Sequence, residues 1–181
     1  MTAIDTDIPE PVRETDKLLP GSVGKLCIAT GFMGALRQTY PDPEAREKFL
    51  RSTFRTADAF VKVDGKTVPF YEEGWPAVVN RRVNFGDKFS LWEWLDHMLS
   101  MSSNAAGSFT WKQAILLRHF GKNFPIPAEE EKAFFDTTAK PDLAREAMET
   151  LEEPLRASGI DTESLRLGTM FTSGGSRVIP G

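Results

Sequence analysis

The stretch from Ser22 to about Tyr40 constrains the fold most, because its apolar residues cover much of the circumference of a single helix. A helix that is apolar on most sides is usually buried, whereas a surface helix carries one apolar stripe. The apolar residues are Leu26, Cys27, Ile28, Ala29, Phe32, Met33 and Leu36. Pro20-Gly21 interrupts the chain just before them. We therefore expect a buried helix in a mainly α domain.

A second helix is expected to begin at Pro43, with Asp42 as its N-cap. Apolar residues follow at helical spacings of three and four, namely Phe49, Leu50, Phe54, Ala57 and Val61. Asp64-Gly65, between two short β-forming runs, is typical of a tight hairpin turn. The stretch from Val68 to Asp87 is then interpreted as a hairpin or loop excursion, with aromatic anchors expected at Tyr71, Trp75 and Phe85.

The second half of the chain is predicted to be largely helical. Ser90 and Glu93 form a capping box at the start of one helix. The segment 100–104 should interrupt it, and Gly121 should close the next helix. Pro154 is expected to break or kink a later helix. The expected helices run from Ser90 to about Leu99, from Ala105 to Phe120, and over 128–138, 141–153 and 161–167.

Composition excludes several classes of function. The 181 residues include 22 Lys and Arg against 26 Asp and Glu, so the net charge of −4 offers no electrostatic footprint for nucleic acid. No apolar run approaches the roughly 20 residues needed to span a bilayer. The single cysteine, Cys27, allows no internal disulfide and is expected as a small core residue. We expect no metal and no organic cofactor.

The candidate chemistry begins with Ser22-Val-Gly-Lys25, which has the form S-x-x-K. Residues three apart on a helix are neighbours, so the lysine amine can reach the serine hydroxyl. A serine needs such a base to take its proton as it attacks, and partial burial can lower a lysine pKa enough for that task. The backbone N–H of Ser22 at a helix start could also stabilise an oxyanion. The tetrapeptide alone equally fits a helix N-cap serine beside a solvated lysine.

Ser102-Ser103-Asn104 adds a second motif, S-x-N, in the expected break between two helices. A loop of this kind can aim a hydroxyl and an amide into a cleft shared with the first helix. Ser102 could pass a proton to a leaving group, and Asn104 could hold both a substrate amide and the lysine. An ordinary turn between helices would favour the same residue types.

Together these motifs resemble those of the serine β-lactamases and penicillin-binding proteins, which carry S-x-x-K, S-D-N and K-T-G. The segment Gly86–Ala106 is similar to the family's glycine-aspartate turn, helix and S-D-N loop. Leu165-Arg-Leu167 and Val178-Ile-Pro-Gly181 resemble the surroundings of its omega loop. The resemblance spans about Pro20 to Gly181. It implies the helical lobe of a β-lactamase-like or transpeptidase-like α/β fold, with one β-hairpin excursion.

The resemblance also implies roles for four residues. Ser22 would be the nucleophile, Lys25 the general base, Ser102 a proton shuttle and Asn104 the anchor for substrate and lysine. The substrate would be a β-lactam or a peptidoglycan-like peptide, attacked at an amide carbonyl. The runner-up hypothesis is a non-catalytic helical binding module derived from that family. A third is a purely structural helical protein, in which Ser22 and Lys25 would lie far apart.

Three departures from the family pattern limit the expected activity. The stretch between Ser22 and Ser102 is longer than in class A β-lactamases, and the excursion at 62–87 can hold the excess. No acidic residue occurs in Met170–Gly175, where those enzymes carry the glutamate that activates the deacylating water. No K-T-G or K-S-G follows Ser102. The chain is therefore expected to be slow or inactive alone.

We expect residues 1–19 to form an N-terminal arm and residues 20–181 a helical domain that is incomplete at both ends. Such a lobe should expose an apolar surface, around the helix Leu26–Leu36 and around Met170 and Phe171, through which it could self-associate. Two further features are interpreted as structural. Asp96-His97 is expected as a solvated pair, and Glu129–Glu131 as carboxylates at a helix start.

Overall fold

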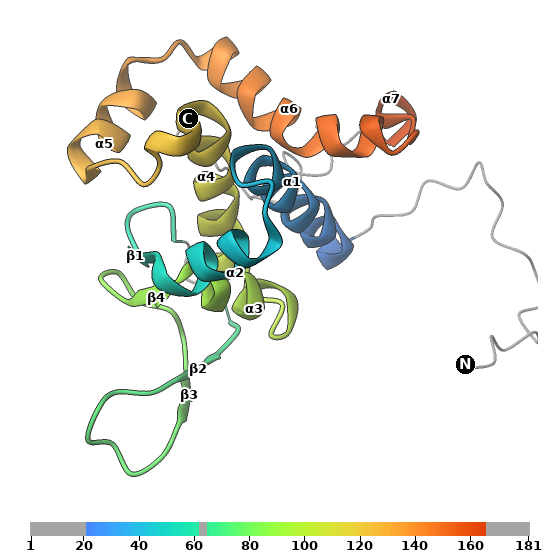
Figure 1. The fold of residues 1–181 in the computed structure, drawn as a ribbon. Coiled ribbons are helices and arrows are strands. Elements are labelled where there is room, and N and C mark those ends of the chain that lie inside the picture. Colours follow the sequence, from blue (N-terminus) through green and yellow to red (C-terminus); the bar gives the residue numbers. More distant parts are fainter. Residues whose placement is uncertain (1–20, 62–64, 166–181) are drawn as a thin grey trace, which may run out of the picture.

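The computed structural model describes residues 21–61 and 65–165, and it is mainly helical with two small antiparallel sheets (Figure 1). The longer helices are α1 (Gly24–Thr39), α2 (Pro43–Ser52), α3 (Leu91–Leu99), α4 (Asn104–Phe120), α5 (Ala128–Thr137) and α6 (Lys140–Ala157). Short helical turns occur at η1 (Gly21–Val23), η2 (Gly121–Asn123) and α7 (Thr162–Leu165). The strands are β1 (Phe54–Thr56), β2 (Val68–Phe70), β3 (Val79–Arg81) and β4 (Lys88–Ser90). The predicted mainly α class is confirmed.

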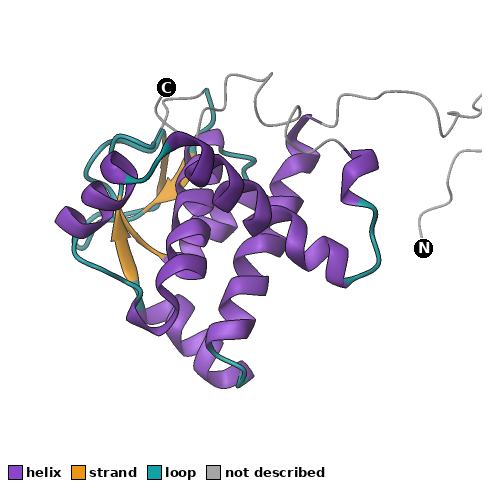
Figure 2. Ribbon diagram, turned by 90° about the horizontal axis from the view of Figure 1, so that it is seen from above, coloured by secondary structure: helices purple, strands orange, loops and turns teal. Residues whose placement is uncertain are grey.

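Helix α4 forms the centre of the core, with α1, α3 and α6 packed against it. Its residues are buried from Ala105 to Leu117 on every side. The strands lie at one side of the helices (Figure 2). Helix α1, which was expected to be buried all round, instead has two faces. Phe32 and Leu36 are fully buried, whereas Leu26 and Met33 are exposed.

Local capping chemistry predicted several helix ends correctly. The Asp42 carboxylate accepts the N–H of Ala45 at the start of α2. The capping box at α3 is complete, since the Ser90 Oγ accepts the Glu93 N–H and the Glu93 carboxylate accepts the Ser90 N–H. Gly121 adopts φ +53° where α4 ends, a backbone conformation that suits glycine.

The second helix is shorter than predicted, because β pairing takes over where the apolar pattern continues. Helix α2 ends at Ser52, and Thr53 is extended. Strand β1 then pairs with β4, with Phe54 opposite Ser90. The Trp94 indole of α3 donates to the Arg55 carbonyl and ties this strand to the helices. Helical spacing from Phe54 to Val61 was therefore misleading, since long-range pairing outweighed a local preference.

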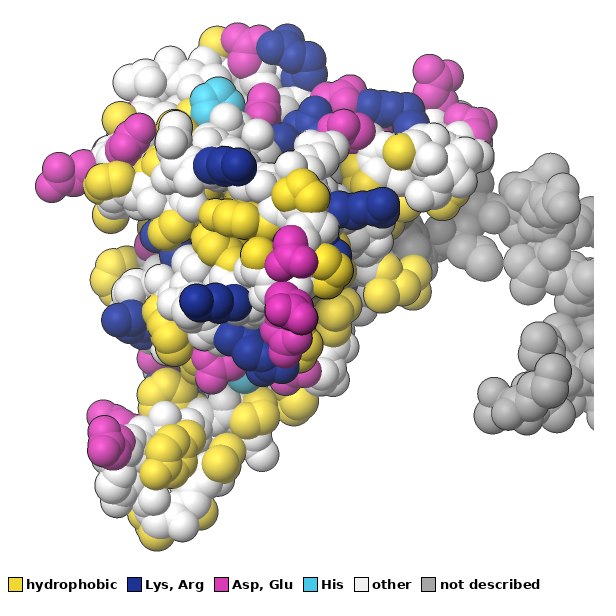
Figure 3. All heavy atoms as spheres, viewed as in Figure 1, with side chains coloured by type: hydrophobic (Ala, Val, Ile, Leu, Met, Phe, Trp, Pro, Cys, Tyr) yellow, Lys and Arg dark blue, Asp and Glu magenta, His cyan; other side chains and the backbone are white. Residues whose placement is uncertain are grey.

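The excursion between β1 and β4 contains the predicted hairpin, in which β2 pairs with β3. This hairpin projects away from the helices, and hydrophobic side chains gather on it (Figures 1 and 3). Tyr71 and Phe85 are 60% and 80% exposed, so they do not anchor the excursion as expected. Trp75 contacts the ring of Phe70. The turn predicted at Asp64-Gly65 lies partly outside the described residues.

Helix α6 continues through Pro154 to Ala157, so the predicted break at this proline is wrong. Glycines on α1 let the two helices approach closely. A Cβ on Gly31 would lie 2.4 Å from the Thr150 carbonyl oxygen, and one on Gly34 would lie 3.1 Å from the Pro154 Cβ. Pro154 has no backbone N–H, so the Thr150 carbonyl loses its usual hydrogen bond within the helix. Packing against α1 stabilises α6 at the point where this hydrogen bond is missing.

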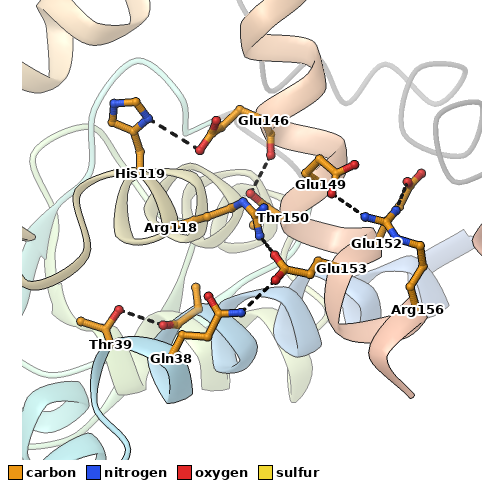
Figure 4. A network of polar contacts seen from close by, with 11 residues as sticks. Gln38, Thr39, Arg118, His119, Glu146, Glu149, Thr150, Glu152, Glu153 and Arg156 are labelled. Atoms are coloured by element: carbon orange, nitrogen blue, oxygen red, sulfur yellow. Dashed lines mark hydrogen bonds and ion pairs between the residues drawn. The ribbon is translucent and has the colours of Figure 1, made fainter. Parts of the chain in front are cut away.

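A network of charged and polar side chains connects helices α1, α4 and α6 (Figure 4). The Glu153 carboxylate of α6 pairs with Arg118 of α4 and accepts a 3.0 Å hydrogen bond from the Gln38 amide of α1. One carboxylate of α6 therefore contacts two other helices, α4 and α1. The arm predicted at 1–19 and the segment 166–181, with Met170, Phe171 and the omega-loop resemblance, lie outside the described residues.

Candidate active site

The first pair of predicted site residues lies where the chain enters α1. Ser22 belongs to the short turn η1, and Lys25 lies in the first turn of α1. Ser22 is exposed, whereas Lys25 is buried, with 9% of its surface accessible. The Lys25 Nζ donates to the Ser22 Oγ at 3.1 Å. The three-residue spacing thus brings an accessible hydroxyl against a buried amine.

The second pair lies where the loop between α3 and α4 meets α4. Ser102 belongs to this loop, residues 100–103, which we call the site loop, and Asn104 is the first residue of α4. The Ser103 N–H donates to the His97 carbonyl at 3.2 Å, and the Ser103 Oγ accepts the Ala106 N–H as the N-cap of α4. Ser102 adopts φ +55°, a left-handed conformation that non-glycine residues rarely adopt. Bonds on either side of Ser102 hold this strained conformation.

The two pairs meet at the Lys25 amine. Its Nζ lies 3.4 Å from the Ser102 Oγ and 2.7 Å from the Asn104 Oδ1, besides its contact with Ser22. An ammonium group has three donors, and these three oxygens can accept all of them. A Cβ on Gly107 of α4 would lie 3.4 Å from the Lys25 Cε, so the small residue leaves room for the lysine chain.

The structure therefore brings Ser22, Lys25, Ser102 and Asn104 together around one nitrogen atom. Two of the alternatives raised by the sequence are wrong. Lys25 is buried rather than solvated, and the N-cap of α1 is Val23, without a side-chain cap. The purely structural hypothesis required Ser22 and Lys25 to lie far apart, and they are in contact.

The arrangement of these four residues determines what chemistry they can perform. The exposed Ser22 hydroxyl can approach a bound molecule, while the buried amine stays behind it. An amine in its neutral form can take the hydroxyl proton, and a second hydroxyl on the same amine can carry that proton onward. Asn104 fixes the amine and is itself exposed, so its side-chain amide can also face a ligand.

A second polar cluster, which the sequence reasoning missed, surrounds Lys112 in the middle of α4. Lys112 is 3% exposed, and its Nζ pairs with Asp58 and, at 2.6 Å, with Glu131. Arg55 of β1 also pairs with Glu131. Burial lowers the pKa of Lys112, and the hydrogen bond that Lys112 donates to the Asp58 carboxylate opposes that shift. The sequence signal was a lysine inside an apolar helix. Glu131 lies in the first turn of α5, as expected, and is in addition a buried partner of Lys112 and Arg55.

His97 is also buried, so the expected solvated pair Asp96-His97 is wrong. The side chain is 5% exposed, and burial lowers its pKa. A usable signal was its place on the same side of α3 as the buried Trp94 and Met98. Cys27 is half-buried and packs against the core, where burial raises the pKa of its thiol, as expected for a core residue.

Comparisons with protein-family models, with curated proteins and with solved structures found no match to this chain. Within residues 21–61 and 65–165, no group of three or more His, Cys, Asp and Glu side chains is placed to hold a metal ion. No helix in that part of the chain has the length and apolarity needed to cross a membrane.

Proposed function

We propose that this chain belongs to the serine acyl-transfer type of the β-lactamases and D,D-peptidases, with Ser22 as nucleophile and Lys25 as its base. The described helices would correspond to the helical lobe of that fold. Ser102 passes the proton to the leaving group, and Asn104 holds the substrate amide and the lysine. The substrate is a β-lactam or a peptidoglycan-like peptide.

One observation carries the proposal: a single buried amine contacts the side-chain oxygens of Ser22, Ser102 and Asn104. The motifs that supply them come from different helices and are remote in sequence. An ordinary helix start and an ordinary interhelical turn have no reason to face each other through three matched polar groups. Such convergence on a nucleophile is the geometry that activated serines require.

The proposed step conserves atoms and charge. The Ser22 Oγ attacks the carbonyl carbon while neutral Lys25 takes the hydroxyl proton. The C–N bond then breaks, and the leaving nitrogen receives a proton through the Ser102 hydroxyl. The product is an ester of Ser22, which water hydrolyses or an amine accepts. Hydrolysis releases the acyl group as a carboxylic acid, and transfer to an amine releases it as an amide. Either reaction regenerates the free Ser22 hydroxyl.

Turnover is proposed to be negligible. The sequence Met170–Gly175 contains no carboxylate for activating the deacylating water. Without such a carboxylate, an ester on Ser22 has no group to activate water against it, so it should persist. The expected behaviour is slow formation of a long-lived adduct on Ser22.

Intact-protein mass spectrometry after incubation with a reactive penicillin tests this proposal. One added penicillin mass should appear and should map to the peptide that contains Ser22. Ser22→Ala should abolish it, whereas Ser52→Ala, at another exposed serine, should not. An adduct that persists in Ser22→Ala, or rapid turnover that this substitution leaves unchanged, would contradict the assignment.

The second candidate is a helical binding module derived from the same family, which keeps the four site residues but performs no chemistry. The same hydrogen bonds favour it if the amine stays protonated, because an ammonium donates to all three oxygens and cannot take a proton. Saturable binding of the penicillin by calorimetry, with no mass increase after long incubation, would favour this candidate over the enzyme.

A further inference from the structure

His97 lies in the last turns of α3, directly before the site loop. Its ring is buried, and within the described part of the chain neither ring nitrogen has a hydrogen-bond partner. The ring packs edge-on against Phe89 of β4, with ring centres 4.8 Å apart and planes at 87°. A buried imidazole without a partner is unusual, because such polar groups are normally hydrogen-bonded.

The surroundings of this ring suit its neutral form. Phe89 in turn contacts Phe70 of β2 and Trp94 of α3, so the neighbouring strands present aromatic surface. The charged groups that act on the ring are Asp96 and Glu93, both on α3 itself, and their attraction is weaker than the cost of burial. Both are already engaged. Asp96 accepts the Ser100 hydroxyl, and Glu93 accepts the N–H and hydroxyl of Ser90.

The backbone of His97 is connected to the candidate site. Its carbonyl accepts the N–H of Ser103, the residue between Ser102 and Asn104. Ser100 is bonded to α3 as well, through the Asp96 carbonyl. Any displacement of this last helical turn therefore pulls on the site loop, in which Ser102 is already held in a left-handed conformation.

We propose that His97 is a proton-sensitive latch for the site loop. While its ring is neutral, α3 stays packed on Phe89 and holds Ser102 and Asn104 against Lys25. A proton on the ring places an unpartnered charge among aromatic side chains, so the ring moves toward water and the loop loosens. The site would then be assembled at neutral pH and released in acid. Its consequence for acylation rests on the proposed function, but the movement of the loop does not.

The direction follows from linkage. Burial puts the pKa of His97 in the closed form below the ordinary value near 6.5, which the ring recovers once it reaches water. The open form therefore binds the proton more tightly. Between the two pKa values, each unit of decreasing pH favours the open form by up to about tenfold.

Hydrogen exchange of the full chain, measured from pH 7.5 to pH 5 and corrected for intrinsic rates, tests the latch. Amides of the site loop should lose protection in acid in the unmodified protein. His97→Gln and His97→Phe should remove that pH dependence, whereas His119→Gln should keep it, since His119 is half exposed and paired with Glu146. The same pH dependence in the His97 variants would overturn the proposal.

An NMR titration and an acylation assay complete the test. If the His97 variants fold poorly, NMR titration of the His97 ring in the unmodified protein takes the place of the variants. An ordinary pKa near 6.5, or protonation without change in the loop amides, would again overturn the latch.

Acylation of Ser22, followed over the same pH range, should slow in acid as the loop opens. Absence of any adduct at every pH would refute the proposed function, while the exchange data would still decide on the latch.

Discussion

The Lys25 Nζ lies 2.7 Å from the Asn104 Oδ1, although 79 positions separate the two residues in the chain. This contact joins the start of α1 to the start of α4, two helices that pack along each other. The neutral Asn104 amide oxygen accepts a hydrogen bond from the Lys25 amine, and it does so whether the amine is protonated or neutral. The contact holds the amine beside Ser22, with which it would exchange a proton under the proposed function.

Asn104→Asp tests the importance of that neutral partner. A carboxylate in the same place would stabilise the protonated lysine and raise its pKa, so less neutral amine would be present to take the Ser22 proton. We expect penicillin adduct formation to slow by roughly tenfold or more, which corresponds to a shift of about one pKa unit. Asn80→Asp, at an exposed position in β3, is the control. An unchanged rate in Asn104→Asp would argue against Lys25 as the base.

Ser102 allows stability and reactivity to be separated. Its φ of +55° costs about 1 kcal/mol for a residue with a Cβ, a strain that glycine does not suffer. Ser102→Gly should therefore retain or slightly raise the free energy of unfolding while slowing adduct formation. Ser102→Ala keeps the strain and loses the hydroxyl, so it should slow the adduct without gaining stability. Urea unfolding and mass spectrometry on both variants check this, and equal stability of the two would show that the strain is negligible.

Gly31→Ala should destabilise the contact between α1 and α6. The added Cβ would lie 2.4 Å from the Thr150 carbonyl oxygen, which is backbone and cannot turn aside. We expect a loss of about 1–3 kcal/mol in the free energy of unfolding, as for other overpacked sites. Gly107→Ala is the matched control, because its nearest neighbour would be a side-chain carbon at 3.4 Å. Denaturant midpoints that fall equally in both variants would contradict the close approach of the two helices.

Lys112→Met should be the most destabilising of these changes. Removing the cation leaves Asp58 without this partner, and Glu131 with Arg55 alone, in a largely buried cluster. Loss of one member of a buried pair typically costs about 3–5 kcal/mol. Adding Glu131→Gln should recover part of the loss, because the cluster then holds one negative charge, on Asp58, and one positive charge, on Arg55, in place of two negative and one positive. Lys132→Met, in an exposed pair with Asp136, should change stability by less than about 1 kcal/mol.

Much of the helical framework could be predicted because its signals are local. Asp42-Pro43 and the box from Ser90 to Glu93 act within one helical turn, so they set the starts of α2 and α3 wherever those helices pack. The spacing of Ser22 and Lys25 is local in the same sense. Their contact follows from helix geometry once the segment is helical.

Only the tertiary structure decided features that depend on remote partners. Phe54–Thr56 became a strand because residues 88–90 pair with it, against its helical spacing. Helix α6 continued through Pro154 because α1 packs against it through glycines. Lys112 and His97 lie among apolar residues of one helix, which signals burial, but the elements that surround them are distant in sequence and no local signal names those partners. The approach of Asn104 to Lys25 is of this kind as well. It required α1 and α4 to pack together, since spacing along one helix cannot bring two helices into contact.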